Sequence, residues 1–205
     1  MQHNGNKLIA NLYDAEAPEK IRRQVIGLLR RQFTFTVRPV VVLCIGSDRY
    51  TGDVLGPLTG TFLEETTGYP IFGTMDNPVH AGNLQDAIQE IYRQYDDPVI
   101  VAVDACLGTA AEVGNIEVWE GGIQAGSAVG KRLPCIGHIS LAGVVNSEGI
   151  IGAVSLQSTS LSLVMKISKV ISVALQAALY NIAGTLPADK ALIGEDLVPE
   201  HVDSD

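Results

Sequence analysis

The stretch VVVLCIG, residues 40–46, decides the fold class of this chain. Its apolar, mostly β-branched residues run without interruption up to a glycine, which is typical of a strand buried on both faces of a parallel sheet. A second stretch of the same kind, VIVAV at residues 99–103, ends at Asp104. The two stretches therefore predict central strands whose carboxyl ends lead into polar loops.

Helical patterns alternate with these strands along the chain. We expect helices near residues 18–31, 57–67, 83–95 and 160–182, and further strands near residues 70–72, 115–120, 136–145 and 150–156. Alternation of strand and helix is the signature of an α/β domain with helices on both faces of its sheet. The predicted fold is therefore one three-layer α/β/α domain with a mixed, mainly parallel sheet.

The chain of 205 residues has the length of a single domain. We expect residues 1–17 to be weakly ordered, residues 18–186 to form the domain, and residues 187–205 to form an acidic tail. The tail holds six acidic residues and one lysine, whereas residues 18–38 hold six basic residues and one glutamate. We interpret both segments as solvated; the alternative is that the tail, or a partner, docks on the basic helix.

Composition restricts the partners of the protein. The formal net charge of −9 argues against nucleic acid, because phosphate binding needs a basic surface. The most apolar long stretch, residues 161–183, contains two lysines, a glutamine and an asparagine, which is too polar for a membrane span. Three cysteines without a signal peptide indicate a reducing, cytoplasmic location. The sequence leaves open whether the protein forms a homo-oligomer.

Two aspartates are the strongest candidates for chemistry. Asp53 lies in the loop after the first central strand, and Asp104 directly follows the second. Since ligands of open α/β sheets bind at the carboxyl ends of the strands, we expect both carboxylates to reach one crevice. Such a pair suits acid/base or metal chemistry. The structural alternatives are a helix-capping role for Asp53 and a bracing hydrogen bond from Asp104.

Other residues of the same loops complete the predicted pocket. They are Gly46, Ser47, Asp48, Gly52, His80, Asn83 and Cys106. We interpret Asp48 as solvated and Cys106 as a packing residue, because a nearby carboxylate raises the pKa of a thiol. The first loop contains neither a P-loop nor a dinucleotide-binding fingerprint. An imidazole from His80 or His138 would complete a triad for a divalent metal if it converged with the aspartates; otherwise each is a loop or packing histidine.

Several segments together resemble the YyaC family of sporulation proteins, small relatives of the spore germination protease. The matching segments are VLCIGSD at 42–48, GDVLGPL at 52–58, residues 73–84, VDACLG at 103–108, residues 137–146 and residues 156–159. The resemblance extends from about Pro39 to Gly184. It implies the phosphorylase/hydrolase-like α/β/α fold, which hydrogenase-maturation endopeptidases share.

The resemblance also implies roles for particular residues. The aspartates regarded as catalytic in the germination protease match Asp53 and Asp104. In hydrogenase-maturation endopeptidases the two corresponding acids and a histidine hold a metal, and His138 takes the third place by rough position. A divalent metal is therefore the one cofactor that the resemblance puts forward, and a peptide or protein the expected substrate.

Three functional hypotheses follow. The first is a peptidase in the cytoplasm of a sporulating cell or forespore, in which ionised Asp53 activates water and protonated Asp104 acts as the acid. Neighbouring acids split their pKa values, and a helix N-terminus favours the anion on Asp53. The second is a non-catalytic sporulation factor that keeps the pocket to bind a peptide or protein. The third is a metal-dependent maturation endopeptidase.

Overall fold

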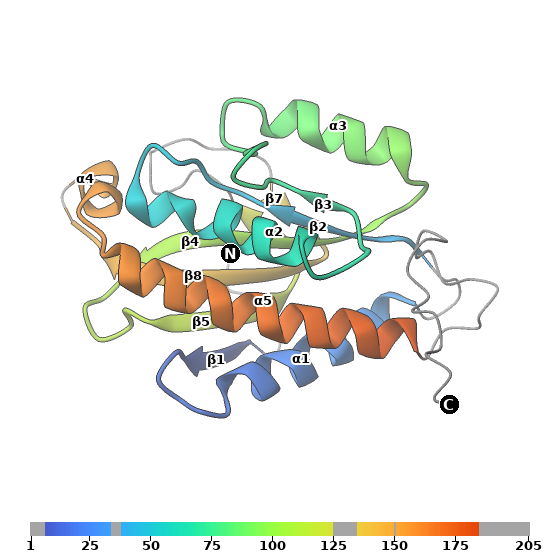
Figure 1. Ribbon diagram of the computed structural model, residues 1–205, viewed down its shortest axis with the longest axis horizontal. Helices are drawn as coiled ribbons and strands as arrows, with labels where there is room; N and C mark the ends of the chain where they lie inside the picture. The colour runs from blue at the N-terminus through green and yellow to red at the C-terminus, as the bar shows by residue number, and fades with distance from the viewer. Residues whose placement is uncertain (1–6, 34–37, 125–134, 150, 185–205) are drawn as a thin grey trace, which may run out of the picture.

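The predicted α/β architecture is confirmed by a computed structural model, which describes residues 7–33, 38–124, 135–149 and 151–184 (Figure 1). A mixed six-stranded sheet has the order β1-β5-β8-β4-β2-β3. Its strands are β1 (Leu8–Asn11), β2 (Val40–Cys44), β3 (Ile71–Phe72), β4 (Val99–Gly108), β5 (Asn115–Glu120) and β8 (Ile139–Ser147). Strands β3, β2, β4 and β8 are mutually parallel, and β5 runs antiparallel to both β8 and β1.

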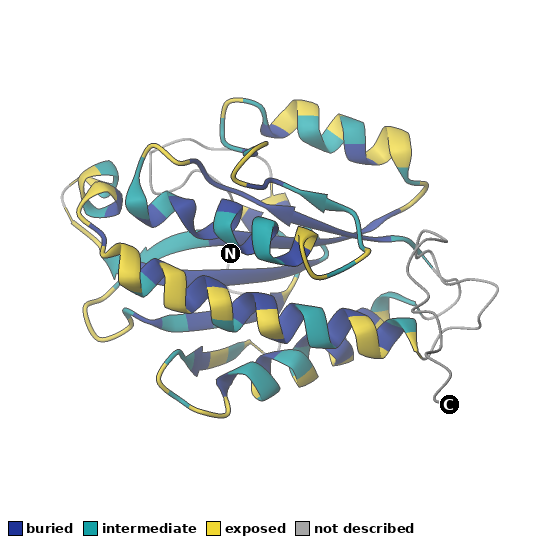
Figure 2. Ribbon diagram, viewed as in Figure 1, coloured by how far each residue is buried: buried dark blue, intermediate teal, exposed yellow. Residues whose placement is uncertain are grey.

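Helices cover both faces of the sheet. Helices α1 (Ala17–Gln32), α2 (Leu55–Glu64) and α5 (Leu161–Ala183) share one hydrophobic core. The other face packs against α3 (Leu84–Gln94) and the small hairpin of β6 (Ile123–Gln124) and β7 (Cys135–Ile136). Figure 2 shows buried residues along the central strands and on the helix sides that face them. These are the three layers expected from the sequence.

Strand β4 separates the two cores. Val99, Val101 and Val103 belong to the core under α1, α2 and α5. Ile100 and Ala102 belong to the core under α3, because successive side chains of a strand point to opposite faces. This central position requires an uninterrupted apolar run, and both predicted central strands are present. The second strand was expected to end at Asp104, but β4 continues to Gly108, so Asp104 lies within the strand.

The amino-terminal region differs from the sequence-based expectation. We expected residues 1–17 to be weakly ordered, but residues 8–11 form β1, which pairs with β5. Asn11 Nδ2 donates a hydrogen bond of 2.9 Å to Asn115 Oδ1, and Lys7 Nζ lies 2.6 Å from Glu117 Oε2. The partner strand lies about a hundred residues further along the chain, so local sequence gives no sign of it. Residues 1–6 lie outside the described part.

The predicted strand at residues 150–156 is also wrong. The segment contains α4 (Gly152–Gln157), and the side chains of Ile151 and Val154 are 60% and 56% exposed. Helix α4 packs against η1 and the end of β8 without pairing as a strand, and Asn146 Nδ2 of β8 donates a hydrogen bond of 2.8 Å to the carbonyl of Ser155. The predicted strand 136–145 is divided at Gly137, whose φ of +105° separates β7 from β8. The tail predicted at 187–205 lies outside the described residues.

We expected residues 161–183 to be too polar for a membrane span, but helix α5 is long and apolar enough to cross a membrane by length and composition alone. It nevertheless packs against α1 and α2, and 44% of its most apolar window is buried within the protein. Ser168 on α5 forms a buried hydroxyl contact of 3.0 Å with Thr59 on α2. Its role as the central helix of one core accounts for its hydropathy.

Candidate active site

The site begins where β2 ends and the chain turns sharply at Gly46. The φ of Gly46 is +147°, and a Cβ atom there would lie 2.0 Å from the carbonyl oxygen of Asp53. The glycine therefore allows the loop to close onto the short 3-10 helix η1 (Thr51–Val54), which carries Asp53. Gly52 of η1 likewise leaves no room for a Cβ, which would lie 2.8 Å from Leu156 of α4. In Figure 1, η1 and α4 lie at the same end of the sheet.

Asp53 is half-buried and partly stabilised as an anion. Ser47 Oγ donates a hydrogen bond of 2.9 Å to its Oδ2 atom. Burial raises the pKa of Asp53, and the Ser47 hydroxyl, the Ser47 backbone N–H and the positive charge that His80 can carry oppose that rise. Asp53 also directly precedes the amino terminus of α2, where backbone N–H groups favour negative charge.

Asp104 lies on β4 and is almost completely buried, with 7% of its surface exposed. The backbone N–H of Ala105 donates a hydrogen bond of 2.8 Å to Asp104 Oδ1. Burial, followed by repulsion from the charge of Asp53, raises the pKa of Asp104 well above its ordinary value. The two aspartates are therefore electrostatically coupled, and Asp104 is the one that keeps its proton to higher pH.

A polar cleft of about 290 Å³ opens beside Asp53. Its lining residues are Ser47, Arg49, Tyr50, Asp53, His80, Ala81 and Gly82. Asp104 is not among them, so the expectation that both carboxylates line one crevice holds for Asp53 and not for Asp104. Arg49 and Tyr50 were not predicted; they lie in the same loop as Asp53, but no pattern in the sequence distinguishes them from their neighbours.

The His80 loop forms the opposite wall of this cleft. The backbone N–H of His80 donates a hydrogen bond of 2.8 Å to Asn83 Oδ1, and Asn83 Nδ2 donates one of 3.0 Å to the carbonyl of Pro78. The backbone N–H of Gly82 donates one of 3.0 Å to His80 Nδ1. Asn83 thus supports the loop and lines the adjoining cavity instead of the cleft, and His80 Nε2 is the ring nitrogen that carries the proton when His80 is neutral.

The remaining predicted pocket residues have other surroundings. Asp48 is exposed, as expected for a solvated side chain, and does not line the cleft. Cys106 is half-buried, and burial, followed by the charges of Glu117 and Asp104, raises the pKa of its thiol to about 12. A thiol with such a pKa is not a nucleophile near neutral pH. Cys106 packs against the core beneath α3.

The predicted metal triad with His138 is wrong. The backbone N–H of Ile100 donates a hydrogen bond of 3.0 Å to His138 Nδ1, and Arg38 Nη2 lies 3.4 Å from Nε2. His138 therefore stands at the amino ends of β4 and β8, whereas the aspartates lie toward the carboxyl ends. In the described ranges of the chain, no three His, Cys, Asp or Glu side chains are grouped so that they could hold a metal ion. The described residues do not fit a three-ligand metal site.

The fold defines the class of protein. It is similar to the crystal structure of a [NiFe] hydrogenase maturation protease, HycI, from Thermococcus kodakarensis KOD1. The TM-score is 0.50 and the sequence identity 17%, and the match covers 75% of this chain and 99% of that one. At 17% identity this similarity shows the fold alone, so the chain is an α/β protein with a HycI-like fold.

Sequence comparison gives the family. Residues 10–174 match the family described as "Protein of unknown function (DUF1256)", and the chain belongs to this family. It is 39% identical over 161 residues to YyaC of Bacillus subtilis (strain 168), covering 78% of this chain and 77% of that protein. The resemblance to the YyaC family inferred from the motifs is thereby confirmed.

Proposed function

We propose that this protein is a peptidase that hydrolyses a peptide bond with Asp53 and Asp104. One observation carries the proposal: the buried carboxyl of Asp104 is coupled to Asp53, and both burial and the charge of Asp53 raise its pKa. Two neighbouring acids cannot both ionise cheaply, so the pair holds one proton and one negative charge. One base and one acid are what hydrolysis of an amide needs.

The geometry suggests the role of each group. Asp53 borders the cleft, where its carboxylate accepts a proton from a water molecule as the water oxygen attacks the scissile carbonyl. Asp104 gives its proton to the nitrogen that leaves as the C–N bond breaks. A proton then passes from Asp53 to Asp104, which restores the pair. Ser47 orients the Asp53 carboxylate through its hydrogen bond of 2.9 Å.

Two further features support this proposal. The fold is similar to that of a hydrogenase maturation protease, and the chain resembles a family associated with spore formation. The expected substrate is a peptide or protein, met in the cytoplasm of the sporulating cell or forespore. The described residues give no three-ligand metal site, so no step of the proposed reaction passes through a metal.

A second function is favoured by one specific observation. Asp104 is only 7% exposed and does not line the cleft beside Asp53. If a substrate does not reach Asp104, the cleft serves recognition of a peptide or protein tail without hydrolysis, as in a non-catalytic sporulation factor. Binding and cleavage must therefore be measured separately.

The test uses the full-length protein and a proteome-derived peptide library, with cleavage followed by mass spectrometry. Asp53→Asn and Asp104→Asn are expected to slow cleavage at least about 100-fold, because each removes one partner of the acid/base pair. Asp48→Asn is the matched control: it changes an exposed carboxyl of the same loop and should cleave like the parent. Circular dichroism checks that each variant folds.

The outcomes separate the two functions. Cleavage that is unchanged in both site variants contradicts the peptidase proposal. Retention of library peptides without cleavage by the parent, weakened by Asp53→Asn and not by Asp48→Asn, supports the binding function in its place.

A further inference from the structure

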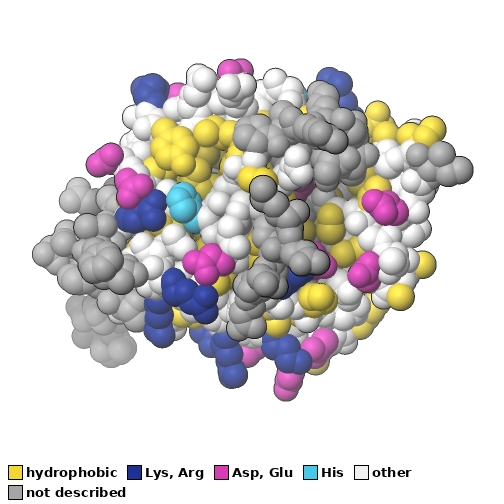
Figure 3. Space-filling view, turned by 180° about the vertical axis from the view of Figure 1, so that it is seen from behind, with side chains coloured by type: hydrophobic (Ala, Val, Ile, Leu, Met, Phe, Trp, Pro, Cys, Tyr) yellow, Lys and Arg dark blue, Asp and Glu magenta, His cyan; other side chains and the backbone are white. Residues whose placement is uncertain are grey.

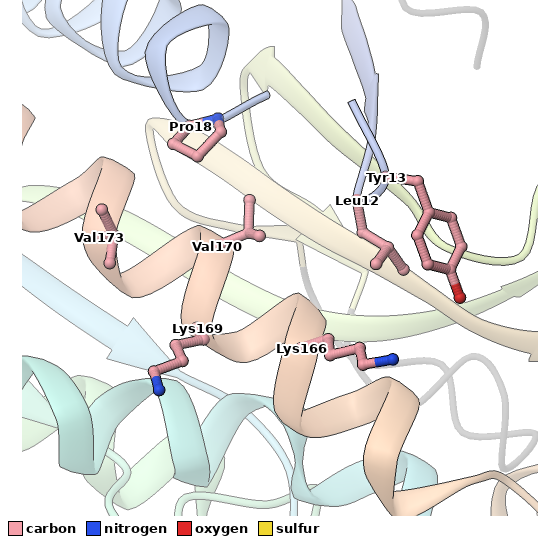
Figure 4. Close-up of a pocket in the computed structure, with 7 residues that line it drawn as sticks. All are labelled: Leu12, Tyr13, Pro18, Lys166, Lys169, Val170 and Val173. Carbon is pink, nitrogen blue, oxygen red and sulfur yellow. The ribbon is translucent and has the colours of Figure 1, made fainter. Parts of the chain in front are cut away.

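A second hollow lies away from the aspartates, between the turn that follows β1 and the outer surface of α5. It has a volume of about 480 Å³, and Figure 4 shows its lining side chains. These are Leu12, Tyr13, Pro18, Lys166, Lys169, Val170 and Val173, which we call the α5 groove. Tyr13 is 74% exposed and Val173 50% exposed. The α5 groove is therefore mainly apolar and open to solvent.

The charge of the α5 groove is not neutralised within the described chain. Lys166 and Lys169 form no ion pair with any carboxylate of the described residues, and Figure 4 shows Lys166 extending below Leu12 and Tyr13 and Lys169 extending from the other side of α5. The basic residues of α1 are different. Lys20 lies 2.7 Å from Asp14, and Arg22 lies 2.6 Å from Glu19. The face opposite to that of Figure 1 also differs, because Figure 3 shows its basic side chains interspersed with acidic ones.

The occupant of the α5 groove must therefore combine apolar side chains with carboxylates. Residues 185–205 have this composition, with six acidic residues, one lysine and several leucines and valines. The stretch LIGEDLV at 192–198 sets the acidic pair Glu195 and Asp196 between apolar residues on both sides. This pattern of apolar and acidic residues complements the α5 groove, in which apolar side chains lie next to Lys166 and Lys169.

Residues 185–205 are also long enough to reach the α5 groove. It follows α5 directly, and at about 1.5 Å per helical residue Lys166 lies roughly 27 Å from Gly184. The eleven Cα-to-Cα steps from Gly184 to Glu195 span up to about 36 Å when the chain is extended. The turn back along the helix therefore needs no change in the fold.

We propose that residues 185–205 fold back along α5 and dock in the α5 groove of the same chain. Leu197 and Val198 cover the apolar floor, and Glu195 and Asp196 pair with Lys166 and Lys169. On the basic helix α1, the docking surface that charge alone indicated in the sequence, Lys20, Arg22 and Arg23 already pair with Asp14 and Glu19. This inference is independent of the chemistry proposed for Asp53 and Asp104.

Zero-length carbodiimide cross-linking of the full-length protein tests the docked arrangement. The expected products join Lys166 or Lys169 to Glu195 or Asp196. The cross-link between Lys20 and Asp14, whose charged atoms lie 2.7 Å apart, is the internal positive control. An equal mixture of ¹⁴N- and ¹⁵N-labelled protein identifies the occupant: all tail cross-links should join peptides with the same label. Mixed labels would mean that a second copy fills the groove, and the proposal would be wrong.

Limited trypsin digestion gives an independent readout, because Lys190 is the tryptic site within the segment. Lys169→Glu is expected to speed cleavage after Lys190 at least about threefold, as one ion pair is lost and a repulsion is added. Arg30→Glu changes the net charge equally, at an exposed position on α1, and should leave the rate unchanged. Equal rates in the parent and both variants, or an absence of the expected cross-links, would overturn the proposal.

Discussion

Asp104 is a carboxyl group that stays neutral in the folded protein over a pH range in which an unfolded chain would ionise it. Burial is the larger cause of its raised pKa, and the charge of Asp53 is the second. The hydrogen bond from the backbone N–H of Ala105 to Asp104 Oδ1 lowers the pKa, but by less than burial and the charge of Asp53 raise it. Because its pKa is raised, Asp104 lowers the free energy of unfolding at pH values above the ordinary pKa of an aspartate. Groups with strongly shifted pKa values occur mainly at functional sites.

The stability of the protein should therefore depend on pH through Asp104. Above pH 3.8, the ordinary value for this group, the folded state binds more protons than the unfolded state, so the free energy of unfolding falls as pH rises. Asp104→Asn keeps the acceptor for Ala105 and removes this loss. The variant should be more stable than the parent at pH 7, with a difference that grows by at most about 1.4 kcal/mol per pH unit and vanishes below about pH 4.

Thermal unfolding of both proteins between pH 3.5 and pH 8 measures this difference, with Asp48→Asn as the control at an exposed carboxyl. A parent and an Asp104→Asn variant with parallel Tm curves would mean that the carboxyl is ionised in the folded protein.

At the scale of elements, the site depends on the contact between the end of β2 and η1. Gly46 brings the two so close that a Cβ atom would lie 2.0 Å from the carbonyl oxygen of Asp53. Four of the residues that line the cleft, Ser47, Arg49, Tyr50 and Asp53, belong to the segment between these two elements or to η1 itself. The element contact therefore sets the position of the base, although Gly46 itself has no chemistry.

Gly46→Ala should destabilise the protein by about 1 to 3 kcal/mol and displace Asp53, because the backbone must move to make room for the methyl group. Gly121→Ala is the matched control. Gly121 also has a positive φ, +111°, but nothing lies within 4 Å of an added Cβ. Denaturant unfolding measures both variants. A Gly46→Ala variant no less stable than Gly121→Ala would show that close approach at Gly46 contributes nothing.

At the scale of the whole molecule, the sheet keeps two ionisable sites apart. Asp53 lies on η1, which contacts α4, and Asp104 lies on β4 beyond the residues that pair with the start of β8. His138 lies at the other end, where it accepts a hydrogen bond from Ile100, and burial, followed by the charge of Arg38, lowers its pKa below the ordinary value. The two ends therefore respond to pH in opposite directions.

Replacement of His138 should change stability at acidic pH and leave the candidate site intact. Below pH 6.5 the unfolded chain binds a proton that folded His138 resists, so the free energy of unfolding falls as pH falls. His138→Gln keeps an acceptor and should flatten the fall in Tm between pH 7 and pH 5. Peptide cleavage should be unchanged, in contrast to Asp104→Asn. Loss of cleavage in a folded His138→Gln variant would contradict the separation of the two sites.

The central part of the fold follows from local patterns of residues. The apolar runs at 40–45 and 99–103 require burial on both faces, and only the middle of a covered sheet provides it. Asp53 and Asp104 were selected for the same reason, since polar residues that follow such strands gather at one edge of the sheet. These are local properties of the chain, so they can be seen without coordinates.

The tertiary structure alone decided the rest. Strand β1 exists because β5 lies beside it, and residues 152–157 form a helix that packs against η1 and is held to β8 by the hydrogen bond from Asn146 to Ser155. His138 directly precedes β8, whereas Asp104 lies further along the neighbouring parallel strand β4, since register places Ile139 beside Val101 and Ala142 beside Asp104. Pairing, register and depth of burial arise between segments distant in the chain, and no local pattern of residues encodes them.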